Sequence, residues 1–347
     1  MALICAYCYV PLQPSKAKRC GKCKRRRYCS QTCQVQDWRC THRTHCGACG
    51  ELGTDVEVRP SPLGGVGLFA LRPFAPDERI MVERAISWQS LGREKTTMAA
   101  AMKLLPHGTS LRDKFELNQM RRDTCTDETI LNTCSSTDGV LCVTMSRVNH
   151  ACLPNCTYST KYIGTDDDVH DGSNRREYKV LIASRPISSG EEITISYISS
   201  MSEKHMLWRK WHFHCTCHVC QDPTKGAQLR QCEELDAQFL IDAQRAQFGE
   251  TERLPRAISA CHQLLKLYDC LQRSAIAYLR TYYDLFQVCV MRRESLKKAQ
   301  VAISLAVHYA SRYHGNDSPK VTQMRDYADD MTRHPLYLCL EHISLPS

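Results

Sequence analysis

Cysteine and histidine pairs dominate the first 50 residues of the chain. Four pairs follow one another at short spacings: Cys5-x2-Cys8, Cys20-x2-Cys23, Cys29-x3-Cys33 and His42-x3-Cys46. Each pair places two ligand atoms on one tight turn or one helical turn, and zinc takes four such ligands in a tetrahedral arrangement. The eight residues therefore predict two structural zinc sites. His45 is a less favoured substitute for His42.

Four later runs combine glycine, polar and aromatic residues in ways that suit a binding site. They are Gly64-Gly65-Val66-Gly67, Asn149-His150-Ala151-Cys152, Glu191-Glu192-Ile193-Thr194-Ile195-Ser196-Tyr197, and Phe213-His214-Cys215-Thr216-Cys217-His218-Val219-Cys220. Glycines let a backbone approach a ligand without a side chain intervening. Taken alone, each run has a plain structural explanation, such as a capping asparagine or a tyrosine that packs at a strand end.

The net charge of the chain is concentrated in the cysteine-rich segment. Residues 1–50 contain ten lysines and arginines but a single acid, Asp37, so they carry the whole formal charge of +9. The other 297 residues hold 36 basic and 36 acidic side chains. The basic run Lys22–Arg27 predicts either a weak nucleic-acid contact or a solvated face.

Composition excludes several classes of protein. A chain of 347 residues can bury a stable core without disulfides. No run approaches the roughly 20 apolar residues of a membrane span. The first apolar stretch is interrupted by Cys5 and Cys8 and has no preceding basic region, which argues against a secretory signal. The 22 cysteines therefore predict reduced thiols and metal ligands in a nuclear or cytosolic protein.

The elements that must position these residues change along the chain. Short β-type runs occur at Val56–Val58, Ile80–Val82, Tyr178–Ala183 and Glu192–Tyr197, and residues 94–105 and 111–122 have helical composition. From about residue 228, apolar residues recur at helical spacing and predict four or five helices. We therefore expect an α+β protein with a zinc finger at 1–50, a β-rich domain at 54–200, a cysteine segment at 201–225 and a helical domain at 226–347.

The residues around the first zinc ligands resemble the MYND finger, through Tyr28-Cys29-Ser30, Gln34, Asp37-Trp38 and the final histidine and cysteine. The resemblance implies interleaved pairs, with Cys5, Cys8, Cys29 and Cys33 on one zinc and Cys20, Cys23, His42 and Cys46 on the other. Eight residues separate Cys33 from His42, where seven are usual. The resemblance also implies a groove for a proline-rich peptide at Gln34 and Trp38, although Trp38 alternatively packs inside the finger.

The four later runs, in their order, closely resemble the SET domain of protein lysine methyltransferases. With the finger attached, the chain resembles the SMYD family, and a finger that precedes the whole SET domain is typical of its arthropod branch. The resemblance implies lysine methylation of a histone or another protein with S-adenosyl-L-methionine as cofactor. It further implies a part in transcription regulation, a nuclear and cytoplasmic location, a monomeric protein and a TPR-like helical C-terminal domain.

The same resemblance implies roles for individual residues. Tyr197 corresponds to the catalytic tyrosine, and Trp211 lies at the wall of the lysine channel. The expected cofactor contacts are Gly65, Val66, Gly67, Asn132, Asn149, His150, Tyr197 and Phe213. A third zinc is expected on Cys152, Cys215, Cys217 and Cys220, with Cys156 as a competing fourth ligand. Three zinc ions per chain follow.

Two departures from the family pattern support an alternative function. Val66 stands where many relatives have a polar residue, and Trp211 replaces a tyrosine. In this alternative the SET fold is a catalytically weak scaffold, and the chain acts as a transcriptional co-regulator that recruits proline-rich partners through its finger. The presence of Tyr197 and of Asn149-His150 favours the enzyme.

Overall fold

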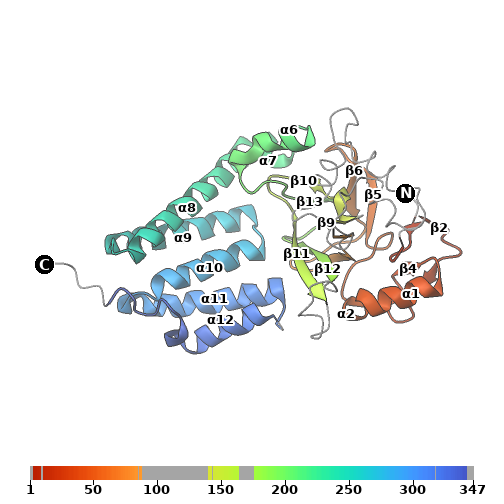
Figure 1. Cartoon of the computed structure of the whole chain (residues 1–347). Helices are drawn as coiled ribbons and strands as arrows, with labels where there is room; N and C mark the ends of the chain where they lie inside the picture. Colours follow the sequence, from red (N-terminus) through yellow and green to blue (C-terminus); the bar gives the residue numbers. More distant parts are fainter. Residues whose placement is uncertain are drawn as a thin grey trace, which may run out of the picture. The chain divides into compact units, whose positions relative to one another are not determined.

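The computed structural model describes residues 3–8, 11–84, 86–87, 140–142, 144–163, 176–316 and 318–341. The described chain forms two compact units, Met1–His218 and Val219–Ser347. The first unit contains the cysteine-rich segment and all described strands, and the second is helical (Figure 1). The predicted α+β class is confirmed. The helices expected at 94–105 and 111–122 lie outside the described residues.

The cysteine-rich segment folds into short hairpins followed by a helix. Ser30 caps this helix, because its hydroxyl accepts a hydrogen bond from the backbone N–H of Cys33 at 3.1 Å. The buried apolar residues of the segment are mostly cysteines together with Leu12 and Tyr28, so apolar burial is too small to stabilise it without metal. Its elements are β1 (Leu3–Ile4), β2 (Pro11–Leu12), β3 (Lys18–Arg19), β4 (Arg27–Tyr28), α1 (Gln31–Asp37), the π-helix η1 (Trp38–His42) and α2 (Arg43–His45).

A four-stranded sheet gathers three of the motifs that the sequence separates widely. Its spatial order is β10 (Asn149–His150), β13 (Glu192–Ile195), β6 (Val66–Ala70) and β5 (Val56–Pro60) (Figure 1). β10 runs parallel to β13, and the other neighbours are antiparallel. The predicted strand at Glu192–Tyr197 is confirmed, although it ends at Ile195.

A three-stranded sheet packs against the same apolar core. Its order is β11 (Cys156–Ile163), β12 (Arg176–Ala183) and β7 (Arg79–Arg84), all antiparallel. Leu68 and Ile193 from the first sheet and Ile80 and Leu181 from the second are fully buried in one cluster. This shared core holds the two sheets together, including β6, β10 and β13, which carry the sequence motifs. The short strands β8 (Ile86–Ser87) and β9 (Val140–Leu141) pair beside it.

Short helices flank β10 and β13 in the sequence. The 3-10 helix η3 (Met145–Arg147) precedes β10, and three others follow β13: the 3-10 helix η5 (Met201–Lys204), α6 (His205–Trp211) and α7 (His218–Gln221). His212 ends α6 in the left-handed region, with φ 57°. After this turn, the Phe213 ring lies beside His150 and Tyr197, which come before α6 in the sequence.

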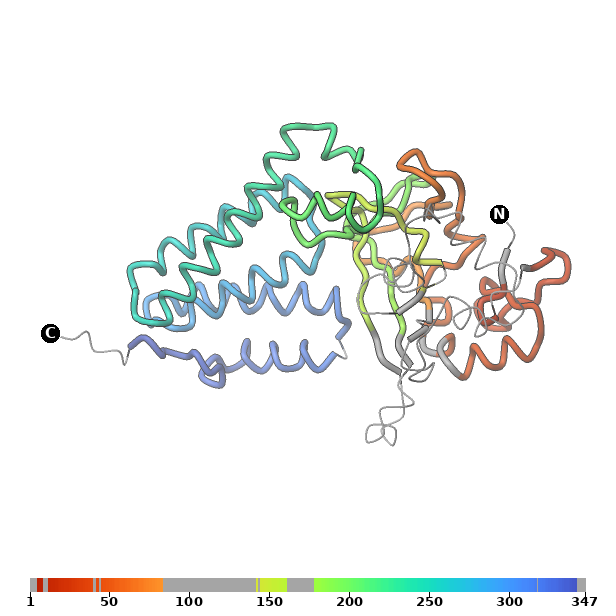
Figure 2. The backbone as a smooth tube through the Cα atoms, turned by 45° about the horizontal axis from the view of Figure 1, so that its top comes forward, coloured from red at the N-terminus to blue at the C-terminus, as the bar shows by residue number. Residues whose placement is uncertain are grey.

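The helical prediction for the C-terminal part is also confirmed. Successive helices run back and forth beside one another around an apolar core that includes Phe286 and Ile303 (Figures 1 and 2). Among the described residues, no helix is both long and apolar enough to cross a membrane. The five long helices are α8 (Pro223–Gln247), α9 (Leu254–Leu271), α10 (Ala275–Cys289), α11 (Leu296–His314) and α12 (Pro319–Asp329).

Candidate functional site

The four-stranded sheet brings Asn149, Glu192 and Gly67 together. Asn149 pairs with Thr194 across the parallel β10–β13 ladder, and Glu192 pairs with Phe69 across the antiparallel β13–β6 ladder. The Asn149 Nδ2 atom lies 2.7 Å from Glu192 Oε1 and 3.2 Å from the backbone oxygen of Val66. Three segments that lie far apart in the sequence therefore meet at one place: Asn149 is 43 residues from Glu192 and 83 from Val66.

The chemistry of these contacts fixes the orientation of the Asn149 amide. A carboxylate oxygen and a backbone carbonyl both accept hydrogen bonds, so only the NH2 group of Asn149 can face Glu192 and Val66. The amide oxygen must then point the other way. It is presented as an acceptor, suited to a ligand that donates, such as an ammonium group.

Glycine has a structural reason at Gly65, in the turn between β5 and β6, and at Gly67, within β6 itself. Gly65 has φ +59°, in the left-handed region that side chains disfavour. A Cβ atom on Gly67 would lie 2.1 Å from Glu192 Oε1 and 3.1 Å from Asn149 Nδ2. The close approach at Gly67 is therefore made by these two side chains of the protein itself.

His150, on β10, is buried and lies between Tyr197 and the third cysteine cluster. Its Nδ1 accepts a hydrogen bond from the Tyr197 backbone N–H at 3.0 Å. Burial lowers the pKa of His150 to about 4, so the ring is neutral at pH 7 and carries its proton on Nε2. That nitrogen lies 3.5 Å from the sulfur of Cys152, an outer contact typical of metal sites.

Three aromatic rings cluster around Tyr197. The Tyr197 ring centroid lies 5.1 Å from that of Trp211, 5.4 Å from that of His150 and 6.4 Å from that of Phe213. The Tyr197 hydroxyl donates to the backbone oxygen of Val148 at 2.6 Å. Since its one proton is committed there, the phenol oxygen acts toward a reactant as an acceptor.

The third cysteine cluster consists of the four residues that the resemblance implied. The sulfur atoms of Cys152, Cys215, Cys217 and Cys220 all lie within 4.8 Å of one another. Contacts with Cys215 and Cys217, together with burial, raise the pKa of Cys152, so the thiolate form needs a nearby cation. The competing ligand Cys156 instead begins β11 and is buried in the apolar core.

Two further four-ligand clusters lie in the N-terminal segment, interleaved as predicted. Cys5, Cys8, Cys29 and Cys33 form one, and Cys20, Cys23, His42 and Cys46 form the other. The Cys23 sulfur lies 3.3 Å from His42 Nε2, and the sulfur atoms of Cys20 and Cys46 are 3.9 Å apart. Tetrahedral zinc with bonds of about 2.3 Å places thiolates about 3.8 Å apart, so the donor sets fit zinc.

The additional residue between Cys33 and His42 is absorbed by a π-helix. Residues Trp38–His42 form this wider turn directly after α1. A π-helix bonds residue i to i+5 and accommodates one more residue per turn than an α-helix. His42 consequently remains in the cluster, and His45 is not one of the four ligands.

The comparisons with known proteins agree with this geometry. A SET-domain family model matches residues 65–198, and a MYND-finger model matches residues 5–46. The chain is 24% identical over 366 residues to histone-lysine N-methyltransferase Smyd1 of Mus musculus, covering 91% of this chain and 69% of that protein. It is 26% identical over 316 residues to histone-lysine N-methyltransferase SMYD3 of Homo sapiens, covering 79% and 68%.

The chain is similar to proteins of the SMYD family. Its MYND finger precedes the SET domain, as the sequence predicted. A third relative, histone-lysine N-methyltransferase set5 of Schizosaccharomyces pombe, is 25% identical over 216 residues, which cover 59% of this chain and 61% of that protein. The SET domain and these relatives place the chain among the protein-lysine methyltransferases.

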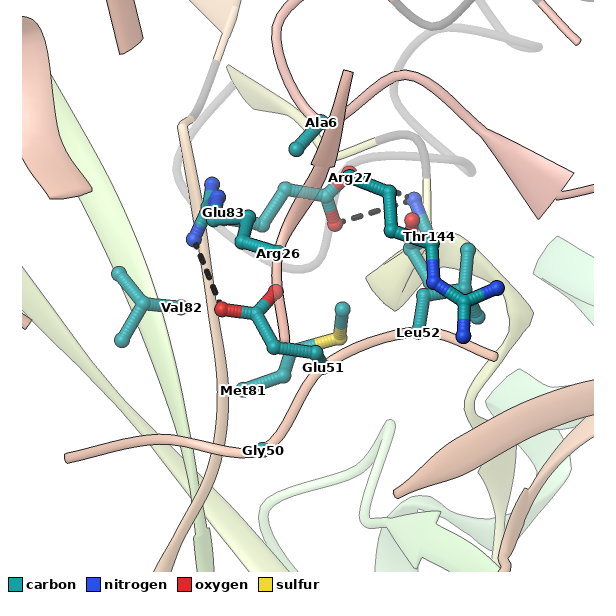
Figure 3. Close-up of a pocket in the computed structure, with 10 residues that line it drawn as sticks. All are labelled: Ala6, Arg26, Arg27, Gly50, Glu51, Leu52, Met81, Val82, Glu83 and Thr144. Carbon is teal, nitrogen blue, oxygen red and sulfur yellow. Dashed lines mark hydrogen bonds and ion pairs between the residues drawn. The ribbon is translucent and has the colours of Figure 1, made fainter. Parts of the chain in front are cut away.

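A buried charged network in the MYND finger reaches the segment that leads to the SET domain. The Arg26 guanidinium pairs with Asp37 at 2.9 Å and with Glu51 at 3.7 Å, and the Tyr28 hydroxyl donates to Asp37 at 2.8 Å. Arg26 and Glu51 line a cavity of about 50 Å³ together with Glu83 from β7; Figure 3 shows these lining residues. Its volume and polar lining suit a few ordered waters.

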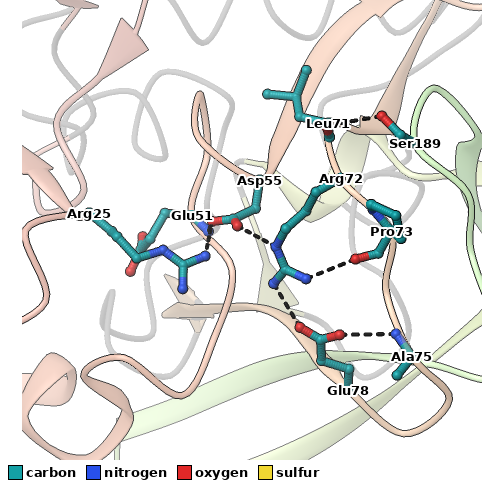
Figure 4. A network of polar contacts seen from close by, with 9 residues as sticks. All are labelled: Arg25, Glu51, Asp55, Leu71, Arg72, Pro73, Ala75, Glu78 and Ser189. Atoms are coloured by element: carbon teal, nitrogen blue, oxygen red, sulfur yellow. Dashed lines mark hydrogen bonds and ion pairs between the residues drawn. The ribbon is translucent and has the colours of Figure 1, made fainter.

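Asp55 joins the finger to the SET domain. Its carboxylate pairs with Arg25 of the finger and accepts from Arg72 Nε at 2.6 Å, while Arg72 also bonds Glu78 at 2.7 Å (Figure 4). Burial opposes ionisation, but the hydrogen bonds from Arg25 and Arg72 hold the pKa of Asp55 below its ordinary value. Two members of the basic run Lys22–Arg27, Arg25 and Arg26, are thus structural.

Of the remaining predicted residues, Trp38 and Gln34 are described by the structure and Asn132 is not. Trp38 packs against the small core of the finger and lies edge-on to His42, with ring centroids 5.8 Å apart; Gln34 is half-buried on α1. Asn132 lies outside the described residues.

The sequence did not predict two residues of the site, Glu192 and Ser61. The Glu191-Glu192 pair was the available signal, but the sequence does not tell which of the two carboxylates faces Asn149.

Proposed function

We propose that the chain transfers a methyl group from S-adenosylmethionine to the side-chain amine of a lysine in a histone or another protein. The observation that carries the proposal is the position of the Tyr197 hydroxyl. It is held by the Val148 carbonyl at 2.6 Å, within a cluster of aromatic rings and beside the strand that presents Asn149. Positioning and exclusion of water are what methyl transfer chiefly requires of a protein.

The residues around Asn149 fit the cofactor. S-adenosylmethionine supplies a methyl group activated by a sulfonium centre when it is bound. The outward Asn149 Oδ1 would accept from the cofactor's α-ammonium group, and the backbone of Gly65–Gly67, where the turn enters β6, would lie along its amino-acid portion. His150 and Phe213, whose ring centroids are 6.2 Å apart, would flank the adenine portion.

Tyr197 is the proposed catalytic residue. Because its hydroxyl donates to Val148, the phenol oxygen would accept from an N–H of the neutral lysine amine or from the polarised methyl C–H. Trp211, with its ring 5.1 Å from that of Tyr197, would form a wall of the channel that the lysine enters. Both rings would exclude water from the reacting amine.

The other parts of the chain support this function. Each of the three four-ligand clusters would hold one zinc ion, and these ions would stabilise the finger and the segment that carries Phe213. The MYND finger would recruit a proline-rich protein through Gln34 and Trp38. We propose that the protein is a monomer. We also propose that it acts in the nucleus and cytoplasm, where it can reach a lysine of a protein substrate.

Calorimetric titration of the zinc-loaded full-length protein with S-adenosylmethionine tests the proposal. We expect one molecule of cofactor per chain and an affinity that falls about tenfold or more in Asn149→Ala, since a charge-assisted hydrogen bond is lost. Val301→Ala, a change at an exposed side chain of α11, should bind as tightly as the wild type. Absence of binding at millimolar cofactor would refute the proposed methyltransferase activity and favour the catalytically weak scaffold.

A further inference from the structure

We infer that Glu192 is a positioning residue for the cofactor and that it acts through the Asn149 amide. This inference deepens the proposed function and rests on it. The Glu192 carboxylate is half-buried beside Gly67, and its Oε1 accepts from Asn149 Nδ2 at 2.7 Å. An acceptor at this position binds the Asn149 NH2 group. It thereby keeps the Asn149 oxygen turned toward the ligand side.

The orientation of an asparagine amide costs little to reverse when its partners can both donate and accept. Here neither partner can donate: Glu192 offers a carboxylate, and Val66 offers a backbone carbonyl at 3.2 Å. The shorter contact is the one to Glu192, and charged acceptors make the stronger hydrogen bonds. Without Glu192, the weaker Val66 contact alone would hold the amide, and water could bind either end of it.

Ser61 fixes Glu192 in turn. The Ser61 hydroxyl lies 2.8 Å from each carboxylate oxygen and also accepts from the Leu63 backbone N–H at 2.9 Å. The Ser61 backbone N–H donates to Gly65 at 3.0 Å, so one residue ties the glycine turn to the carboxylate. The chain from Ser61 through Glu192 to Asn149 thus links the turn, β13 and β10, the three segments that would surround the cofactor.

The preceding residue provides a matched control. The Glu191 carboxylate bonds Arg185 at 2.7 Å, Asn155 at 2.9 Å and the Ser188 backbone N–H at 2.9 Å. None of these partners belongs to the proposed cofactor site. Two adjacent glutamates therefore have different tasks: Glu191 stabilises the strand ends, and Glu192 orients Asn149.

The test measures the dissociation constant of S-adenosylmethionine by calorimetry on zinc-loaded full-length protein. We expect Glu192→Ala to raise it about tenfold. Glu192→Gln keeps an acceptor oxygen and should stay within about threefold of wild type. In an Asn149→Ala background, Glu192→Ala should add no further loss, because the residue through which it acts is gone. Glu191→Gln should lower the melting temperature and leave the dissociation constant unchanged.

Several results would overturn the inference. Wild-type affinity in Glu192→Ala would do so, and so would a full tenfold loss in the Asn149→Ala background. Equal losses in Glu192→Gln and Glu192→Ala would mean that the charge itself contacts the cofactor. If Glu192→Ala does not fold, Ser61→Ala replaces it, with a loss of about threefold that must also vanish without Asn149. Failure of the wild type to bind cofactor would refute the proposed function itself.

Discussion

Loss of the Asp37 carboxylate should destabilise the MYND finger strongly. Asp37 is 3% exposed and Arg26 is 8% exposed, and the two are paired at 2.9 Å. Asp37→Ala removes the carboxylate that pairs with the buried guanidinium at 2.9 Å, leaves the Glu51 contact at 3.7 Å in place, and also removes the acceptor of the Tyr28 hydroxyl. The variant therefore retains a buried charge that has lost its pairing with Asp37.

The magnitude follows from this loss of compensation. Breaking a buried ion pair by removing one partner costs about 3–5 kcal/mol, and the residual Glu51 contact favours the lower end of that range. For a unit of this size, about 1 kcal/mol shifts the melting temperature by about 2–4 °C. We therefore expect a decrease on the order of 10 °C in the transition of the first unit.

Thermal unfolding followed by circular dichroism at one scan rate measures the effect. The matched control is Glu57→Ala, which breaks an ion pair to Arg59 whose side chains are 39% and 43% exposed. Surface pairs contribute at most about 1 kcal/mol, so this variant should melt within about 3 °C of wild type. An Asp37→Ala variant that melted as high as Glu57→Ala would refute the reasoning about the buried pair.

Three other predictions concern protonation and metal. Burial raises the pKa of Glu51 to about 7, so the folded state keeps a proton that the unfolded state releases, and this stability is lost as pH rises through 7. Relative to Glu51→Gln, wild type should lose about 1 kcal/mol between pH 6 and 8; parallel pH profiles would contradict the assignment. Cys217→Ser should lower the zinc content by one ion per chain, whereas Cys270→Ser, outside the clusters, should leave it unchanged in elemental analysis. Chelation of zinc should open the finger to protease while the helical circular dichroism of α8–α12, which pack around an apolar core, persists; simultaneous loss of both would contradict independent stabilisation.

The zinc ligands could be predicted from the sequence because their chemistry is local. Each pair sits on one turn, and spacing alone identifies it. Which pairs share an ion is not local, and here the family resemblance supplied the answer that the structure bears out. The strands were predictable for a similar reason, since Tyr178–Ala183 is a short, mostly apolar run that includes the β-branched residues Val180 and Ile182.

The charged contacts between segments could not be predicted. Lys22, Lys24, Arg25 and Arg26 look alike in the sequence, yet Lys22 and Lys24 are exposed while Arg25 and Arg26 meet buried carboxylates. The distinction depends on which direction each side chain takes from a turn, and that is set by the tertiary fold. The π-helix at Trp38–His42 is similar, because an added residue can be absorbed in several ways.

Transfer of a labelled methyl group tests the central claim most directly. Zinc-loaded full-length protein is incubated with methyl-labelled S-adenosylmethionine and a set of proteins that includes core histones, and labelled products are sequenced by mass spectrometry. We predict label on lysine side chains, reduced on the order of 10²-fold in Tyr197→Phe while cofactor affinity stays within a few-fold. Cofactor binding without label on any lysine, or a Tyr197→Phe variant as fast as wild type, would contradict the account.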